Sequence, residues 1–299
     1  MHKSNNQKQH DYLTRKLFHS IHKKQINTQS GFLRLKNLLN YKNLKLNKDY
    51  FKEKICADLG CGSTGGGALN LLELGCKFVH LMDLNKHIKK PINMNLINFK
   101  DKFKIHVASL EKTPFKNDSF DFILCQNAIH HMDKHEKAFY EIYRILKKNG
   151  KALISVQGEG GLVTKFVYEL LVPEYKRNIA VRKFLTKIIN QDTKRYDIFF
   201  KEQLDLEALK VYKILKKFLD PDLILTIKDR LLSPKYYCFN ERKLTIFLKK
   251  IGFKNIYRIK KKVYFSNIRK LLSPLYHHYD HEISRALYGD GDISLICSK

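Results

Sequence analysis

Three glycines and one carboxylate form the pattern in this sequence that is best suited to bind a ligand. Gly60, Gly62 and Gly65 follow the spacing G-x-G-x-x-G, and Asp83 stands 21 residues beyond Gly62. Glycines at these positions let the backbone approach a ligand at the start of a helix, while a carboxylate at the end of the next strand accepts hydrogen bonds from ribose hydroxyls. The pattern predicts a site for an adenosine-containing ligand.

Asp58 discriminates between two classes of such a ligand. A nicotinamide or flavin dinucleotide would bring a negatively charged pyrophosphate to the helix N-terminus, and Asp58, two residues before Gly60, would repel it. S-adenosylmethionine has no phosphate and carries an ammonium and a sulfonium, which a carboxylate attracts directly or through water. A second role stays open, in which Asp58 is a strand-end carboxylate bonded to backbone amides.

The glycines lie where a strand, a turn and a helix follow one another. An apolar run over 54–59 predicts the strand, and apolar spacing over 68–74, stopped by Gly75, predicts the helix. The next elements repeat this alternation, with strands predicted over 78–82, 104–107, 121–125 and 152–156 and helices over 86–98 and 134–147, the second closed by Asn149-Gly150. Such repeated units form a parallel sheet that has helices on both faces.

Helical patterns replace this alternation after the fifth strand, and we interpret them as an inserted cap. The chain then returns to the sheet through a helix capped by Asn240 and ended by Gly252, followed by strands over 253–259 and 293–297. The predicted fold is a Rossmann-like, doubly wound, mostly parallel sheet of seven strands. Its units are a basic N-terminal helical arm (1–50), a ligand-binding core (51–160), the helical cap (161–240) and C-terminal elements that complete the sheet (241–299).

Two stretches resemble the class I S-adenosylmethionine-dependent methyltransferases. Asp58-Leu-Gly-Cys-Gly62 is similar to the first motif of that class. A longer stretch resembles the type 11 subgroup that includes quinone-biosynthesis methyltransferases, over Thr113-Pro-Phe-Lys-Asn-Asp-Ser-Phe-Asp121, Ala128-Ile-His-His131 and Glu141-Ile-Tyr-Arg144-Ile-Leu-Lys-Lys-Asn-Gly150. The likeness is close between residues 50 and 158 and loose between 240 and 299.

The resemblance implies S-adenosylmethionine as the cofactor and gives each pocket residue a role. The backbone of Gly60, Cys61 and Gly62 would line the methionine moiety, with Asp58 near its ammonium, and Asp83 would hold the ribose. Further contacts would come from Leu84 against the adenine, Ser109 and Leu110 at the adenine edge, and Gln126 beside the methionine. The turn is one residue longer than the usual G-x-G-x-G, so the role of Gly65 stays open, and the family often has Asp where this chain has Ser109.

His131 is the candidate catalytic residue, because the pair His130-His131 follows the fourth strand, where an acceptor should lie. In-line transfer of a methyl group from a sulfonium requires no catalytic residue, but a histidine helps as a general base when the acceptor is a hydroxyl or a protonated amine. The alternative is that the pair packs structurally. We predict no metal site, although two groups of His and Asp have suggestive spacing, namely His131, Asp133 and His135, and residues 277–281.

Composition limits the remaining classes of function. The 299 residues include 57 basic and 29 acidic ones, a net charge of +28, and 46 of the basic residues are lysines. This surplus fits either a nucleic-acid surface or the lysine drift of an AT-rich coding sequence, and we favour drift. Six cysteines without a C-x-x-C pair indicate reduced thiols. The sequence has no uninterrupted apolar run of about 18 residues, so we predict no membrane span. We expect a cytoplasmic protein.

We therefore expect a methyltransferase that acts on a small-molecule or lipid-like acceptor beneath the cap. One alternative is an RNA methyltransferase that uses the basic surface, although Cys125-Gln-Asn-Ala128 differs from the N/D-P-P-Y/F set of base-amine methyltransferases. Another is a non-catalytic S-adenosylmethionine-binding protein. The apolar residues of 166–172, with Lys165 before them and Glu169 among them, fit a packed cap helix or an interfacial helix, and packing is the commoner case.

Overall fold

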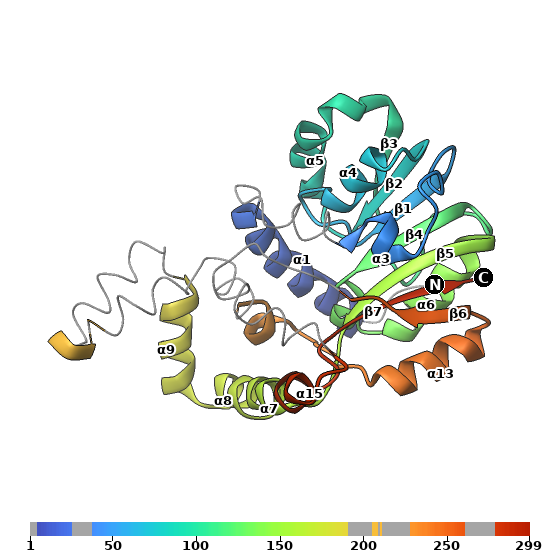
Figure 1. Ribbon diagram of the computed structural model, residues 1–299. Coiled ribbons are helices and arrows are strands. Elements are labelled where there is room, and N and C mark those ends of the chain that lie inside the picture. Colours follow the sequence, from blue (N-terminus) through green and yellow to red (C-terminus); the bar gives the residue numbers. More distant parts are fainter. Residues whose placement is uncertain (1–4, 26–37, 191–204, 209, 211–227, 261–278) are drawn as a thin grey trace.

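The computed structural model describes residues 5–25, 38–190, 205–208, 210, 228–260 and 279–299. A seven-stranded sheet of order β3-β2-β1-β4-β5-β7-β6 forms its centre (Figure 1). The strands are β1 (Ile55–Leu59), β2 (Phe78–Asp83), β3 (Phe103–Val107), β4 (Phe120–Gln126), β5 (Leu146–Gln157), β6 (Lys254–Arg258) and β7 (Asp292–Ser298). Neighbouring strands are parallel except β7, which is antiparallel to β5 and β6. The predicted Rossmann-like sheet is confirmed.

The strand order reverses between β1 and β4, and open sheets of this kind form a ligand crevice at the carboxyl ends of such strands. From β1 the chain continues to β2 and β3 on one side, and it then crosses to β4 and β5 on the other side. Asp58 of β1 pairs with Leu81 of β2 and with Leu124 of β4, so it lies in the middle of the sheet near this switch. Open α/β sheets bind ligands outside the carboxyl ends of their strands at such a point.

Helices cover both faces of the sheet. The core helices are α4 (Gly66–Glu73), η1 (Lys86–Ile88), α5 (Lys89–Asn95), η2 (Ile97–Lys102), η3 (Ile129–His131) and α6 (His135–Ile145). Phe122 and Ile123 are successive residues of β4 and belong to two different buried clusters, because successive side chains of a strand point to opposite faces. Phe122 packs in the cluster of Leu71 from α4, and Ile123 in that of Ile142 from α6.

The end of α6 differs from the prediction. The helix stops at Ile145 and β5 begins at Leu146, so Asn149 lies within the span of β5 and not beyond a helix ending at Lys147. Asn149 has a φ of +64°, and its N–H donates to the carbonyl of Lys299. Leu146 is fully buried and pairs with Phe120 of β4, and this tertiary pairing ends the helix earlier than the helical spacing indicates.

Further helices precede and follow the core. They are α1 (Asn5–Gln25), α3 (Tyr41–Leu44), α7 (Leu162–Lys165), the π-helix η4 (Phe166–Leu171), α8 (Val172–Arg177), α9 (Ile179–Asn190), α13 (Glu241–Ile251) and α15 (Glu282–Tyr288). Asn240 and Gly252 cap α13 as predicted. The boundaries of the arm and the cap stay predictions, because much of 191–227 lies outside the described residues. None of the described helices is long and apolar enough to cross a membrane.

Candidate active site

The turn after β1 requires glycine at its first position. Gly60 has a φ of +73°, a conformation that side chains disfavour. A Cβ at this position would also collide with the Cβ of Ala128 in the loop after β4. The N–H groups of Gly60 and Cys61 both donate to the carbonyl of Met82 in β2, at 2.7 and 3.2 Å. The turn is thereby pressed between the ends of β2 and β4.

Asp83 joins the end of β2 to this turn. One carboxylate oxygen accepts from the N–H of Gly62 at 3.0 Å, and the other accepts from the N–H of Asn85 at 2.9 Å. A carboxylate has about four lone-pair sites, so these two bonds leave capacity to accept from ligand hydroxyls. The structure therefore brings together Gly60, Cys61, Gly62 and Asp83, the residues to which the sequence assigned the methionine and ribose contacts.

Asp58 lies deeper than the other candidates. Its side chain is 3% exposed and accepts from the N–H of Ala68 in α4 at 3.0 Å. A Cβ on Gly67 would collide with this carboxylate, so the first turn of α4 packs directly on it. Burial raises the pKa of Asp58 to about 7, against a lowering by the bond from Ala68. These contacts support the second role that the sequence left open, a carboxylate that holds the backbone of α4.

The structure gives Gly65 a structural role and makes Cys61 an unreactive thiol. Gly65 is the N-cap of α4, and a Cβ there would lie 2.8 Å from Leu96 and 3.3 Å from Ile92, both in the core. Its left-handed φ of +61° explains the glycine without any ligand. Burial raises the pKa of the Cys61 thiol well above its ordinary value, so this side chain is a neutral thiol at pH 7.

Leu84, Ser109 and Leu110 lie in the loops that follow β2 and β3. Leu84 is half-buried directly after Asp83, and Leu110 is buried in the cluster that contains Ile123. The Ser109 hydroxyl accepts from the N–H of Glu111 at 3.3 Å, within its own loop. Their assignment to the adenine stays a prediction.

Gln126 carries a buried polar group without a partner in the described part of the protein. It ends β4, beside the crevice, and its side-chain Nε2 is buried without a hydrogen-bond partner among the described residues. Leaving a buried donor unsatisfied costs about 1 to 3 kcal/mol. Such a group in a native fold requires an explanation, and a polar ligand in the crevice provides one.

His131 is buried and contacted on both ring nitrogens. Its Nδ1 lies 2.9 Å from the hydroxyl of Ser233, and its Nε2 lies 3.6 Å from a carboxylate oxygen of Asp229. Burial lowers the pKa of His131, although Asp229 alone would raise it. The ring is therefore neutral at pH 7, as a base must be, but both nitrogens already face partners.

Helix α1 covers the loops after β3 and β4 (Figure 1), a placement that sequence reasoning missed. The imidazole Nε2 of His10 donates to the carbonyl of His131 at 3.0 Å, and Gln7 donates to Glu111 in the loop after β3. The ring of Phe18 packs edge-on against the His131 ring at 4.7 Å. Gln7 and His10 are buried, at 5% and 9% exposed. Because both residues are polar and lie in a polar, basic helix, nothing in the sequence indicated that they would be buried.

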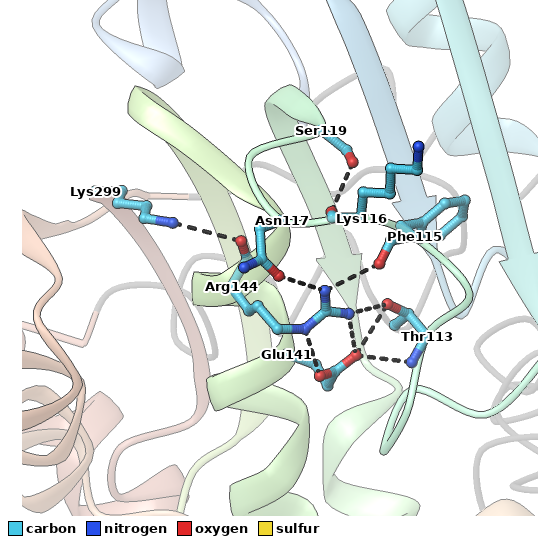
Figure 2. A network of polar contacts seen from close by, with 8 residues as sticks. All are labelled: Thr113, Phe115, Lys116, Asn117, Ser119, Glu141, Arg144 and Lys299. Carbon is cyan, nitrogen blue, oxygen red and sulfur yellow. Dashed lines mark hydrogen bonds and ion pairs between the residues drawn. The ribbon is translucent and has the colours of Figure 1, made fainter.

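The long second motif is held together by a polar network that serves structure (Figure 2). The Glu141 carboxylate of α6 accepts from the N–H of Thr113 at 2.8 Å and from its hydroxyl at 2.9 Å. Arg144 donates to Glu141 and to the carbonyl of Phe115, each within 2.9 Å, and to the side chain of Asn117 at 2.8 Å. The network pins the loop before β4 onto α6.

No cluster of three His, Cys, Asp or Glu side chains suited to a metal ion occurs in the part of the chain that the structure describes. His131 and His135 are described, but His277 and His278 of the second suggestive group lie outside these residues. Asp133 pairs instead with Lys235.

Comparison with known proteins shows that this chain is similar to methyltransferases. Residues 57–154 match the family model described as a methyltransferase domain. The chain is 29% identical over 153 residues to phosphoethanolamine N-methyltransferase 2 of Caenorhabditis elegans, a match that covers 50% of this chain and 33% of the relative. It is 30% identical over 131 residues to the ubiquinone/menaquinone biosynthesis C-methyltransferase UbiE of Rickettsia bellii, covering 42% of this chain and 49% of the relative. The chain thus spans a third to a half of the length of these relatives.

Solved structures share the fold. The 1,6-didemethyltoxoflavin-N1-methyltransferase of Burkholderia thailandensis, crystallised with its namesake ligand and S-adenosylhomocysteine, aligns over 100% of this chain and 92% of its own, with a TM-score of 0.54 and 13% identity. A methyltransferase from Haloferax volcanii, solved in complex with the activator Trm112, aligns over 95% and 96%, with a TM-score of 0.53 and 11% identity.

Proposed function

We propose that this chain, whose core is a class I S-adenosylmethionine-dependent methyltransferase domain of the type 11 family, transfers a methyl group to a small-molecule or lipid-like acceptor. The observation that carries the proposal is the joined unit of Gly60, Gly62 and Asp83 beside the unsatisfied amide of Gln126. At one end of the sheet, this unit offers the backbone of the glycine turn, the Asp83 carboxylate as an acceptor for ribose hydroxyls, and the Gln126 amide as a hydrogen-bond donor.

The residues present fit the cofactor. The backbone of Gly60, Cys61 and Gly62 would hold its methionine moiety, the remaining lone pairs of Asp83 its ribose hydroxyls, and Gln126 a polar group of its methionine end. When bound, S-adenosylmethionine supplies an activated methyl group on a sulfonium. Asp58 would act indirectly, because its carboxylate positions the start of α4 beside the turn.

The other residues of the site would orient the acceptor and exclude water. Helix α1 covers the loops after β3 and β4, and its contacts with His131 and Glu111 close this side of the crevice. A dry, aligned site favours transfer because the charge of a sulfonium is dispersed in the transition state. His131 as a general base stays a prediction, and the contacts with Ser233 and Asp229 support a positioning role.

A direct test is titration of the full chain with S-adenosylmethionine and with NAD in a calorimeter, followed by assay of S-adenosylhomocysteine release. The acceptor panel comprises phosphoethanolamine, a sterol and a quinone precursor, which are the compound classes in the names of the relatives. We expect S-adenosylmethionine to bind, NAD not to bind, and one acceptor to raise the release. Tight binding of NAD alone would refute the proposal, and S-adenosylmethionine binding without turnover would favour the non-catalytic alternative.

A further inference from the structure

The helices that follow β5 expose an apolar stripe to solvent. Leu162, Phe166 and Leu170 are 68%, 57% and 56% exposed. They are spaced by four residues along consecutive helical turns, so they share one face. Two more large apolar side chains of α9 are exposed as well, Ile179 at 62% and Phe184 at 54%. Large exposed apolar side chains that gather on neighbouring helices mark an interaction site in a folded protein. We call these five residues the outer stripe.

The opposite face of the same helix packs toward the candidate acceptor site. Thr164 is buried, and the ring of Tyr168 stacks on Tyr236, with centroids 4.8 Å apart and planes 28° apart. Tyr236 in turn contacts the rings of His130 and His131 at 4.8 and 4.9 Å. One helix therefore lies between the loop that carries His131 and the surface that carries the outer stripe.

Basic side chains are interspersed with the outer stripe along the same segment of the chain. The exposed cations of this segment are Lys165, Lys176, Arg177, Arg182 and Lys183. The acidic residues are fewer: Glu169 is exposed, and Glu174 forms an ion pair with Arg177. Apolar side chains interleaved with Lys and Arg are typical of helices that lie in the headgroup region of an anionic bilayer.

Two other occupants fit this surface less well. In a symmetric dimer through this face, the basic side chains of one copy would meet those of the other, since a twofold interface pairs a patch with itself. Single-stranded RNA binds through aromatic side chains on which bases stack, whereas three of the five residues of the stripe are aliphatic.

We propose that the outer stripe docks this protein on an anionic membrane surface, with α7, η4 and α9 lying at the headgroup level. The acceptor is then a membrane-resident amphiphile that reaches the crevice past Tyr168. The part about the acceptor rests on the proposed methyltransferase function, whereas the docking itself does not. Docking also explains why Phe166 and Leu170, which the sequence favoured as packed residues, are exposed.

The test is co-sedimentation of the full chain with vesicles of phosphatidylcholine alone and with vesicles that contain about 30 mol% phosphatidylglycerol, whose anionic headgroups create a negative surface potential. The test variant is Phe166→Ser/Leu170→Ser. The matched control is Met94→Ser/Ile97→Ser, which removes two apolar side chains that are slightly more exposed, 66% and 62%, from α5 and η2 at the other end of the molecule (Figure 1). Thermal unfolding and S-adenosylmethionine titration of each variant verify the fold and the cofactor site independently.

We expect the wild type to bind anionic vesicles and the test variant to lose about tenfold or more of this binding, because two large apolar side chains no longer enter the bilayer. The control should retain binding within about twofold. Equal binding of wild type and test variant would overturn the proposal, since net charge alone would then explain adsorption. A concentration-dependent dimer that only the test variant abolishes would assign the stripe to a second copy instead. Failure to bind S-adenosylmethionine would refute the proposed function and leave the docking result standing.

Discussion

The carboxylate of Asp83 accepts a hydrogen bond from the N–H of Gly62 at 3.0 Å, and this bond makes the end of β2 and the turn after β1 one unit. The same turn is bonded to β2 a second time, through the N–H of Gly60 and the carbonyl of Met82. A ligand that contacts the turn therefore meets the Asp83 carboxylate at a fixed position.

Asp83→Asn should weaken S-adenosylmethionine binding by about 1 to 3 kcal/mol, because a charged acceptor for the ribose is replaced by a neutral one and the bond to Gly62 weakens. Isothermal titration calorimetry measures the change. Asp101→Asn makes the same substitution at an exposed position on η2 and should leave the affinity as it is. Equal affinities of both variants would show that Asp83 does not contact the cofactor.

Gly60→Ala should abolish cofactor binding and lower the melting temperature, because its Cβ would collide with Ala128 and displace the turn. Gly75→Ala is the matched control. Gly75 also has a positive φ, +90°, but a Cβ there meets nothing within 4 Å. The control should lose only the strain of a side chain in the left-handed conformation, about 1 to 2 kcal/mol, and should bind normally. A Gly60→Ala chain that binds as well as the control would contradict the tight turn.

Asp58→Asn should remove a pH-dependent part of the stability. The pKa of Asp58 is raised from 3.8 to about 7 by burial, so the folded state binds the proton more tightly than the unfolded chain does. The stabilisation is present below pH 3.8 and is lost as the pH rises toward about 7. Urea unfolding of wild type and variant across this window should show the wild type losing stability relative to Asp58→Asn. A constant difference would contradict the shift.

The same variant separates the two roles of Asp58. If its carboxylate holds only α4, Asp58→Asn should reduce S-adenosylmethionine affinity less than Asp83→Asn does, because the amide oxygen can still accept from Ala68. A larger loss at Asp58 than at Asp83 would instead indicate contact with the ammonium.

His80 should make the protein sensitive to mild acid. Its Nδ1 lies 2.9 Å from Nε2 of His106 on the neighbouring strand. Burial, then the charges of His106 and Lys104, lower the pKa of His80 from 6.5 to about 4. The unfolded chain therefore takes up a proton first, and stability is lost as the pH falls from 6.5 toward 4. His80→Gln should flatten this loss in urea titrations, and the exposed His87→Gln should leave it unchanged.

Glu141→Gln should destabilise the fold by about 1.5 to 3 kcal/mol, because it breaks charge-assisted bonds that join α6 to the loop before β4. Chemical denaturation measures this change. Glu174→Gln is a control with the same Glu-x-x-Arg spacing, but its partner Arg177 is 73% exposed, against 33% for Arg144. Exposed pairs contribute about 0 to 1 kcal/mol, so the control should change little. Similar losses of unfolding free energy in both variants would show that the network does not stabilise the fold.

Local patterns were sufficient for the core of the fold. The alternation of strands and helices, the glycine turn after β1, the carboxylate at the end of β2 and the caps of α13 were all predictable, because each depends on residues a few positions apart. The seven-stranded sheet followed, since repeated strand-helix units leave few alternatives to a parallel arrangement.

Contacts between distant residues decided the rest. Helix α1 lies on His131, more than a hundred positions away, and Ser233 and Asp229 meet the same ring from the other side. The early end of α6 follows from the pairing of Leu146 with β4. Whether Phe166 and Leu170 pack or face solvent depends on which surface of their helix meets Tyr236. Helical periodicity predicts that a helix has an apolar face. Only the packing of the whole chain determines whether that face is covered.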